Sequence, residues 1–410
     1  MACLRAPRRG FCSRKPILTS SSALLLVLVL SVGCRSTGQR RMHGAPPQEV
    51  EEKTEEIRFT LPQVAVGDRV DGEVIPNDVV GDSTEIVLGA TWKGVPGASS
   101  PLLLLVPGAG RVSRRGVRTK NGSRAYDDPV PVIERLSSYA AYHGFQTLAY
   151  DKRTCGPNES PLCQRNKSPD WDKDGPIALV ADVDAACNKA KEIAPDVPLV
   201  VVAHGQSANV VLASNCALRA DVLVLIALIP DAVDRVLVRG LSRRAQLLRK
   251  WGEKKLRSKK ASERAEGEKE VLESLQLQNR AANLRDIFSQ IRAGRFSNDD
   301  DKNDNPQILG ASASFWQGYF RLTEDAQKHA ERTRATPRVI VLGQWDSQYA
   351  PADKDRIAHF GVVDGHRFVV VKEGDHHLLQ NKELHDESFA EFLDVVRELL
   401  GEPSEKAPTS

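Results

Sequence analysis

A serine near the middle of the chain lies where a strand is expected to pass into a helix. The apolar run Leu199–Ala203 is followed by Gly205-Gln-Ser-Ala-Asn209 and then by a helical pattern. A serine on so tight a turn exposes its hydroxyl, and the first N–H groups of the helix can stabilise an oxyanion. We therefore interpret Ser207 as a nucleophile for acyl transfer and Ala208 N–H as an oxyanion donor. The alternative is a serine that only caps the helix.

Two further segments carry an acid and a base at the ends of apolar runs. Asp346 follows Val339–Leu342, and His376 and His377 form a pair on a loop after Phe368–Val371. Side chains at the carboxyl ends of parallel strands meet at one edge of a sheet. We expect His376 to take the proton of the nucleophile and Asp346 to hold the imidazole tautomer. His377 is the alternative base, and a solvated loop is the alternative for the pair.

A glycine-rich loop offers a second oxyanion donor. Pro107-Gly-Ala-Gly110 comes directly after the apolar run Leu102–Val106. By position, Ala109 N–H is the expected donor. A generic turn is the other interpretation, since glycine-rich turns are common.

Alternating apolar runs and helical patterns must position these residues. The apolar runs have the length of strands that are buried on both faces of a parallel sheet. They lie at 102–106, 146–150, 199–203, 222–229, 339–342 and 368–371. Helical patterns lie at 130–143, 178–194, 208–219, 352–360 and 387–400. Short β patterns at 57–64, 69–75 and 85–92 come first and are expected to be antiparallel. This alternation predicts a doubly wound α/β fold.

The motifs together resemble the α/β-hydrolase superfamily. Ala149-Tyr-Asp-Lys-Arg-Thr-Cys-Gly156 looks like a segment of bacterial serine hydrolases related to monoacylglycerol lipases and serine aminopeptidases. Gly343-x-x-Asp346 and Gly374-Asp-His376 look like the acid and base motifs of that superfamily. The resemblance implies an α/β-hydrolase fold over about residues 100–229 and 335–400. It departs from the pattern at Asn209, where glycine is usual, and at Pro107, where histidine is usual.

The resemblance also implies a reaction. A Ser207–Asp346–His376 triad would cleave a carboxylic ester through an acyl-enzyme, with a peptide or amide as the second substrate class and no cofactor. The two departures from the pattern favour a competing interpretation, which is a non-catalytic, envelope-anchored binding protein of the same fold.

The first 33 residues have the pattern of a secretory signal. Five basic residues precede the apolar run 23–30, and Gly33-Cys34 follows it. This ending resembles a bacterial lipoprotein cleavage site, so we expect Cys34 to carry a lipid anchor and residues 34–56 to form a polar linker. Plain cleavage and secretion is the alternative. The protein would be exported, as a cell-envelope lipoprotein or otherwise as a periplasmic or secreted protein.

The remaining organisation follows from composition. We expect a hydrolase core at 57–230 and 331–403, a helical lid inserted at 231–330, and a tail at 404–410. The basic segment 235–264 within the lid is interpreted as a solvated helix face, with anionic lipid as the alternative. The acidic run 298–305 lacks the glycine and the distant glutamate of a calcium loop, so no metal is expected.

Charge and cysteines set further limits. The formal net charge is +3 and becomes −2 when the five basic residues of the signal are removed, so basicity does not indicate a nucleic-acid partner. Cys155 and Cys163 share one loop and could form a disulfide in an exported protein. Cys187 and Cys216 lie in apolar helical patterns and are expected to be buried thiols.

Overall fold

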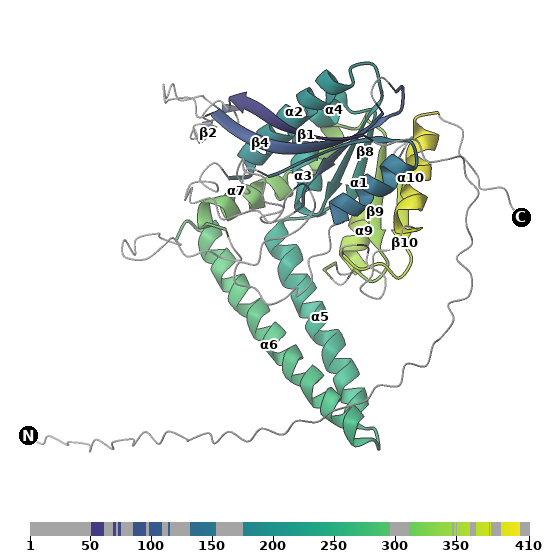
Figure 1. Ribbon diagram of the computed structural model, residues 1–410. Helices are drawn as coiled ribbons and strands as arrows, with labels where there is room; N and C mark the ends of the chain where they lie inside the picture. The colour runs from purple at the N-terminus through teal and green to yellow at the C-terminus, as the bar shows by residue number, and fades with distance from the viewer. Residues whose placement is uncertain are drawn as a thin grey trace, which may run out of the picture. The chain divides into compact units, whose positions relative to one another are not determined.

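An eight-stranded mixed sheet lies at the centre of the chain, in the order β1-β4-β6-β5-β7-β8-β9-β10 (Figure 1). The computed structural model describes residues 51–60, 69–70, 73–74, 85–95, 98–108, 114, 132–152, 175–295, 311–346, 348–349, 351–360, 366–376, 378 and 387–401. The strands of this sheet are β1 Glu51–Thr60, β4 Glu85–Gly94, β5 Leu102–Val106, β6 Gln146–Tyr150, β7 Leu199–His204, β8 Val222–Ile226, β9 Arg338–Gly343 and β10 His366–Val371. A separate pair consists of β2 Arg69–Val70 and β3 Glu73–Val74.

The two halves of the sheet differ in strand direction, as the sequence predicts. The pairs β1–β4 and β4–β6 are antiparallel. From β6 to β10 all neighbouring strands are parallel. Strands β5, β6, β7 and β8 are buried along nearly their whole length, which explains their uninterrupted apolar sequences. The prediction of a mostly parallel, doubly wound sheet is confirmed.

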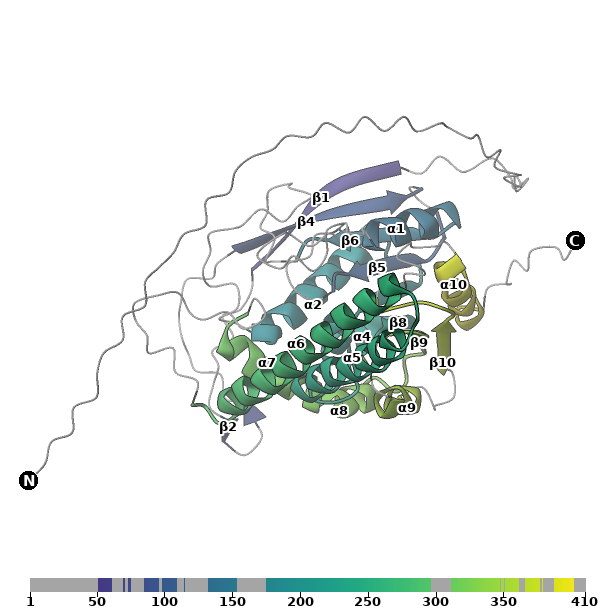
Figure 2. The same ribbon diagram turned by 90° about the horizontal axis from the view of Figure 1, so that it is seen from below.

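Helices cover both faces of the sheet (Figures 1 and 2). They are α1 Val132–Tyr142, α2 Gly175–Ile193, α3 Gln206–Ala213, α4 Cys216–Arg219, α5 Val233–Leu256, α6 Ala261–Arg292, α7 Ala313–Glu324, α8 Ala326–Arg332, α9 Pro351–His359 and α10 Glu387–Leu399. Alternate residues of one strand enter different cores. Leu102, Leu104 and Val106 of β5 pack with α2, α3 and α7, whereas Leu103 and Leu105 pack with α1 and α10.

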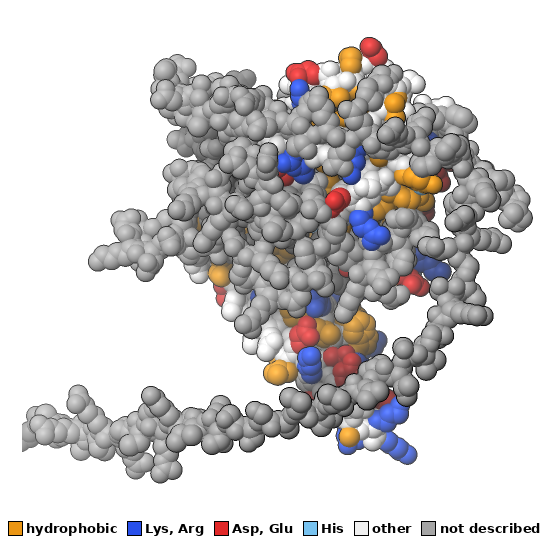
Figure 3. Space-filling model, viewed as in Figure 1, with side chains coloured by type: hydrophobic (Ala, Val, Ile, Leu, Met, Phe, Trp, Pro, Cys, Tyr) orange, Lys and Arg blue, Asp and Glu red, His pale blue; other side chains and the backbone are white. Residues whose placement is uncertain are grey.

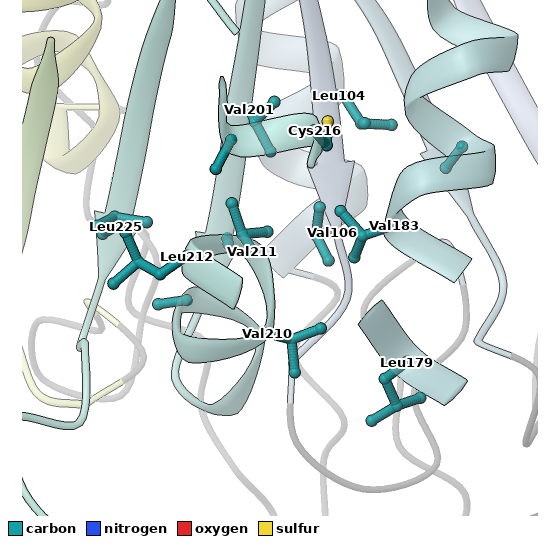
Figure 4. Packing of buried hydrophobic residues seen from close by; sticks show 14 of the residues in the cluster. Leu104, Val106, Leu179, Val183, Val201, Val210, Val211, Leu212, Cys216 and Leu225 are labelled. Atoms are coloured by element: carbon teal, nitrogen blue, oxygen red, sulfur yellow. The ribbon is translucent and has the colours of Figure 1, made fainter. Parts of the chain in front are cut away.

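The expected helix 208–219 is two helices. Ser214 has an extended backbone at φ −80° and ψ 161°, and its N–H donates to Val211 O, which ends α3. Its hydroxyl also donates to Val211 O at 2.7 Å and accepts the Ala217 N–H at 3.3 Å. The break turns α4 toward α2, and Figure 4 shows Cys216 of α4 beside Val201 of β7 and above Val211 of α3.

The segment between β8 and β9 is dominated by a helical hairpin. Helices α5 and α6 run side by side and extend away from the sheet (Figure 1). They approach closely at Gly252 and Gly267, since a Cβ on either glycine would lie 2.7 Å from the carbonyl oxygen of the other. That this hairpin acts as a lid stays a prediction.

Ion pairs fix the base of the hairpin to the core. Arg292 of α6 bonds Asp234 of α5 at 2.7 Å, and Arg239 of α5 bonds Asp353 of α9. The hydrogen bonds of Arg292 to Asp234 and to Glu324 raise its pKa, although partial burial lowers it. Gly240 of α5 packs directly on the loop after β9, since a Cβ there would lie 2.4 Å from Gln348 O. The base of the hairpin therefore supports the loop that carries Asp346.

Candidate active site

A glycine occupies the turn between β7 and α3. The strand ends at His204 and the helix begins at Gln206, so Gly205 is the single residue between them. It has φ 59° and ψ −119°, a conformation that side chains other than hydrogen rarely tolerate. Its N–H donates to Ile226 O of the neighbouring strand at 2.7 Å, which holds the turn against the sheet.

Ser207 lies within the first turn of α3, two residues after the turn residue Gly205. The sequence pattern predicts that Ser207 itself lies in the turn. Its side chain is buried, with 2% of the residue exposed, and its hydroxyl donates to the carbonyl of Pro107 after β5. In the part of the chain that the structure describes, no hydrogen bond joins Ser207 to His376. The expectation that Ser207 occupies the exposed position of the turn is therefore wrong.

The expected acid and base come together across the ends of β9 and β10. The Nδ1 of His376 lies 2.8 Å from Oδ2 of Asp346, whose side chain is fully buried. The other carboxylate oxygen of Asp346 accepts the Gln348 N–H at 2.9 Å. A carboxylate held in this way selects the tautomer in which Nδ1 carries the proton and Nε2 is the basic atom.

The basic atom of His376 faces the turn residue. An ideal Cβ built on Gly205 would lie 3.7 Å from His376 Nε2 and within 4 Å of no other atom outside its chain neighbours in the described residues. A hydroxyl carried by that Cβ would be within hydrogen-bond reach of the imidazole. The acid and base are thus aimed at a side chain that glycine does not have.

Backbone contacts join the acid loop to the base loop. Trp345 N–H donates to Gly374 O at 2.8 Å, and Gln344 N–H donates to Val371 O at 2.9 Å. Gly343 makes this approach possible, because a Cβ there would lie 2.1 Å from Asp375 O. The glycine in Gly343-x-x-Asp346 is therefore required by close backbone packing rather than by a turn.

Comparison with known proteins places this arrangement in a family. The model of the alpha/beta hydrolase family matches residues 103–392. The chain belongs to the alpha/beta hydrolase family. The match covers the turn at Gly205, the acid Asp346 and the base His376. Comparison with curated proteins gives no match.

Solved structures of alpha/beta hydrolases resemble the chain at low sequence identity. A peroxisomal alpha-beta-hydrolase from Saccharomyces cerevisiae is 12% identical with a TM-score of 0.47, over 88% of this chain and 93% of that one. A thermophilic esterase from Thermogutta terrifontis is 13% identical with a TM-score of 0.41, over 78% and 96%. A monoacylglycerol lipase from Paleococcus ferrophilus is 16% identical with a TM-score of 0.40, over 77% and 98%.

In this alpha/beta hydrolase the backbone N–H groups at the start of α3 differ in their surroundings from the expectation. Ala208 N–H donates to Gly205 O at 3.1 Å, and its role as an oxyanion donor stays a prediction. The residue after the turn is Gln206, whose N–H is the first of α3 and points out of the helix start. Ala109, the second expected donor, lies outside the described residues.

A buried lysine joins the two loops that meet at the turn. Lys152 Nζ donates to Gly108 O at 2.7 Å and to Gln206 Oε1 at 3.1 Å. The sequence singled out the surrounding segment for its resemblance and did not assign this role. Arg153, the next residue of that segment, lies outside the described residues.

A second histidine lies beside the pair and was missed in the sequence. His204 Nε2 lies 2.9 Å from His376 O, and the two ring centroids are 5.0 Å apart. Gly108 packs on His204, since a Cβ there would lie 3.0 Å from His204 Nδ1. Its position immediately before the turn glycine is the signal that could have drawn attention to it.

Asn209, a departure from the family pattern, makes a specific connection. Its amide donates to Ile229 O at 2.9 Å and accepts the Ile229 N–H at 3.2 Å. Ile229 follows β8, so Asn209 ties α3 to the segment that leads into the hairpin.

The cysteines differ from expectation. Cys187 of α2 and Cys216 of α4 are buried, as expected, but they form a disulfide with a Cα–Cα distance of 5.7 Å. The prediction of free thiols is wrong because the break at Ser214 brings α4 onto α2, where Cys216 N–H donates to Asp184 at 2.7 Å. Cys34, Cys155, Cys163 and His377 lie outside the described residues.

Within the described residues, no group of three or more histidine, cysteine, aspartate or glutamate side chains could hold a metal ion. Among those same residues, no helix has the length and hydropathy needed to cross a membrane.

Proposed function

We propose that this alpha/beta hydrolase cleaves a carboxylic ester by general-base activation of water, without an acyl-enzyme. The observation that carries the proposal is the glycine at the turn, with His376 Nε2 3.7 Å from the position of its missing Cβ. A water molecule in the place of that missing side chain would donate a hydrogen bond to His376 Nε2. The dyad then acts directly on that water.

His376, Gln206 and Asp346 supply the groups that ester hydrolysis by water requires. His376 Nε2 removes a proton from water while the oxygen attacks the ester carbonyl carbon. Gln206 N–H supports the negative charge of the tetrahedral intermediate. When the intermediate collapses, the ester C–O bond breaks and His376 returns its proton to the leaving alkoxide. The buried Asp346 stabilises the imidazolium between these two transfers.

The substrate class follows from the weak nucleophile. Without a serine, the remaining groups of a triad site accelerate hydrolysis by about 10³–10⁴ over water. Esters have better leaving groups than amides, so a peptide or amide is the less favoured substrate. We also propose that the protein is exported through a signal peptide and anchored by a lipid at Cys34. This part of the proposal rests on the sequence pattern of residues 1–34.

Specific observations favour two competing functions. An acyl-enzyme route through Ser207 is supported by the serine itself, and opposed by its burial and its bond to Pro107. A non-catalytic binding protein is supported by the absence of any hydroxyl at Gly205, and opposed by the intact 2.8 Å contact between His376 and Asp346.

Rapid-mixing hydrolysis of p-nitrophenyl esters of graded chain length tests the proposal. We expect linear release of p-nitrophenol with no initial burst, and no acyl adduct in the intact mass of the quenched protein. Ser207→Ala should keep the rate within about threefold, with folding checked by circular dichroism, because only a single hydrogen bond is lost.

The outcomes separate the three functions. A stoichiometric burst that disappears in Ser207→Ala would establish the acyl-enzyme route and overturn the proposal. Complete absence of turnover for all esters, with saturable ester binding by calorimetry, would establish the binding protein instead.

A further inference from the structure

The far end of the α5–α6 hairpin concentrates positive charge. Residues 249–264 include eight lysines and arginines and two glutamates, a local net charge of +6. The whole chain has a formal net charge of +3, so the rest of it carries −3. Figure 3 shows Lys and Arg side chains gathered at this end of the hairpin. We call residues 249–264 the hairpin tip.

Several cations of the tip are exposed and lack an acidic partner. Arg249 and Lys260 pair with Glu253 and Glu263 within the tip, and Lys255 pairs with two glutamates of α6. Four others are exposed and form no ion pair with the described residues, namely Lys250, Lys254, Arg257 and Lys259. A solvated helix face alone would be expected to balance more of these charges along the helix.

An exposed aromatic side chain lies among these cations. Trp251 is 52% exposed. It follows Lys250 directly and lies about one helical turn before Lys254. Leu256, at the end of α5, is 36% exposed. An indole beside lysines is the combination that lies at the boundary between lipid headgroups and acyl chains, where the ring is buried and the charges reach phosphate.

The hairpin holds the tip away from the core. Helix α5 has 24 residues and is therefore about 36 Å long. The close packing of Gly252 on Gly267 and the pairing of Lys255 with Glu266 and Glu270 lock the two helices together near the tip. The tip can thus contact a flat surface while the negatively charged remainder stays at a distance.

We propose that the hairpin tip docks on a membrane surface rich in anionic phospholipids. Charge complementarity selects an anionic surface, and Trp251 selects a lipid surface over nucleic acid or an acidic protein, because an exposed indole among lysines gains from burial in the interface. The proposal does not depend on the proposed reaction at Gly205. It gives the hairpin a role besides that of the expected lid.

Vesicle binding by residues 34–410 carrying Cys34→Ser tests the proposal without a lipid anchor, in a chain that keeps every described residue. Co-sedimentation is measured with vesicles of pure phosphatidylcholine and with vesicles that contain one third phosphatidylglycerol. We expect binding only to the anionic vesicles. The triple variant Lys250→Glu/Lys254→Glu/Arg257→Glu should lower the partition coefficient tenfold or more, and Trp251→Ala severalfold.

A matched control reverses the same number of charges elsewhere. Arg280, Arg285 and Arg334 are exposed and lie away from the tip, so Arg280→Glu/Arg285→Glu/Arg334→Glu has the same net charge as the tip variant. It should change binding less than threefold. Spin-labelled lipid should quench the fluorescence of Trp251. This part of the tryptophan signal is identified as the difference between the wild type and Trp251→Phe.

Three results would overturn the docking proposal. These are absence of binding to anionic vesicles, an equal loss in the control variant, or tighter binding of the tip to a DNA duplex or polyglutamate than to the vesicles at the same ionic strength.

Discussion

The two halves of the site differ in how much of the catalytic arrangement they keep. On the side of β9 and β10, a buried carboxylate holds an imidazole at 2.8 Å, and the two loops bond to each other through their backbones. On the side of β7 and α3, the turn has the conformation expected of a nucleophile elbow, but the residue in it is Gly205. The His376–Asp346 pair is in place, and residue 205 in front of it carries no hydroxyl.

At residue 205 the backbone has the conformation of a nucleophile turn, although the residue carries no reactive side chain. The turn conformation is set by the junction of β7 with α3 and by the bond of Gly205 N–H to Ile226 O. None of these contacts needs a side chain at residue 205. The turn therefore persists when the hydroxyl is absent, and the retained dyad determines which chemistry is possible.

The largest expected effect comes from removing the base. His376→Ala should lower the rate of ester hydrolysis by about 10²–10⁴, the contribution of a positioned general base. His377→Ala is the adjacent control and should change the rate less than threefold if His376 alone faces the turn. Steady-state kinetics of both variants checks this. A dead His377→Ala with a nearly normal His376→Ala would place the base one residue later.

The next effect concerns the disulfide between α2 and α4 and its contribution to stability. The Cys187–Cys216 disulfide closes a sequence separation of 29 residues and joins α2 to α4, which follows α3. Replacing both cysteines with serine should lower the free energy of unfolding by about 3 kcal/mol, from the entropy of the opened loop. Urea denaturation of the wild type, with and without reductant, and of the double variant measures it. Equal stability in all three samples would contradict a formed disulfide.

The smallest effect concerns Asn209. Asn209→Gly removes both hydrogen bonds to Ile229. We expect a loss of about 1–2 kcal/mol in the free energy of unfolding and no gain in hydrolysis. Thermal denaturation and the ester assay check the two parts. A gain in the hydrolysis rate would show that Asn209 hinders the turn and that our account of its role is incorrect.

Sequence patterns predicted the sheet and the proximity of Asp346 and His376, for identifiable physical reasons. Strands buried on both faces have continuous apolar sequences, so β5 and β6 were located to the residue. Asp346 and His376 each follow such a strand, and parallel strands bring their carboxyl ends together.

Two parts of the site depended on features that local patterns do not contain. The assignment of Ser207 rested on Gly-x-Ser, yet whether Gly205 or Ser207 lies in the turn depends on where β7 ends, which is set by its register with β8. The disulfide depended on the break at Ser214, where a side-chain hydroxyl replaces a helical hydrogen bond. Both are decided by long-range or competing hydrogen bonds.

The central claim is that the His376–Asp346 pair is aimed at residue 205. Intact-mass measurement after exposure to a fluorophosphonate tests it most directly, applied to wild type, Ser207→Ala, Gly205→Ser and Gly205→Ser/His376→Ala. We predict a single adduct in Gly205→Ser alone, mapped to residue 205, because only that variant puts a hydroxyl in front of a functional base. An adduct on Ser207 of the wild type, absent from Ser207→Ala, would contradict the account.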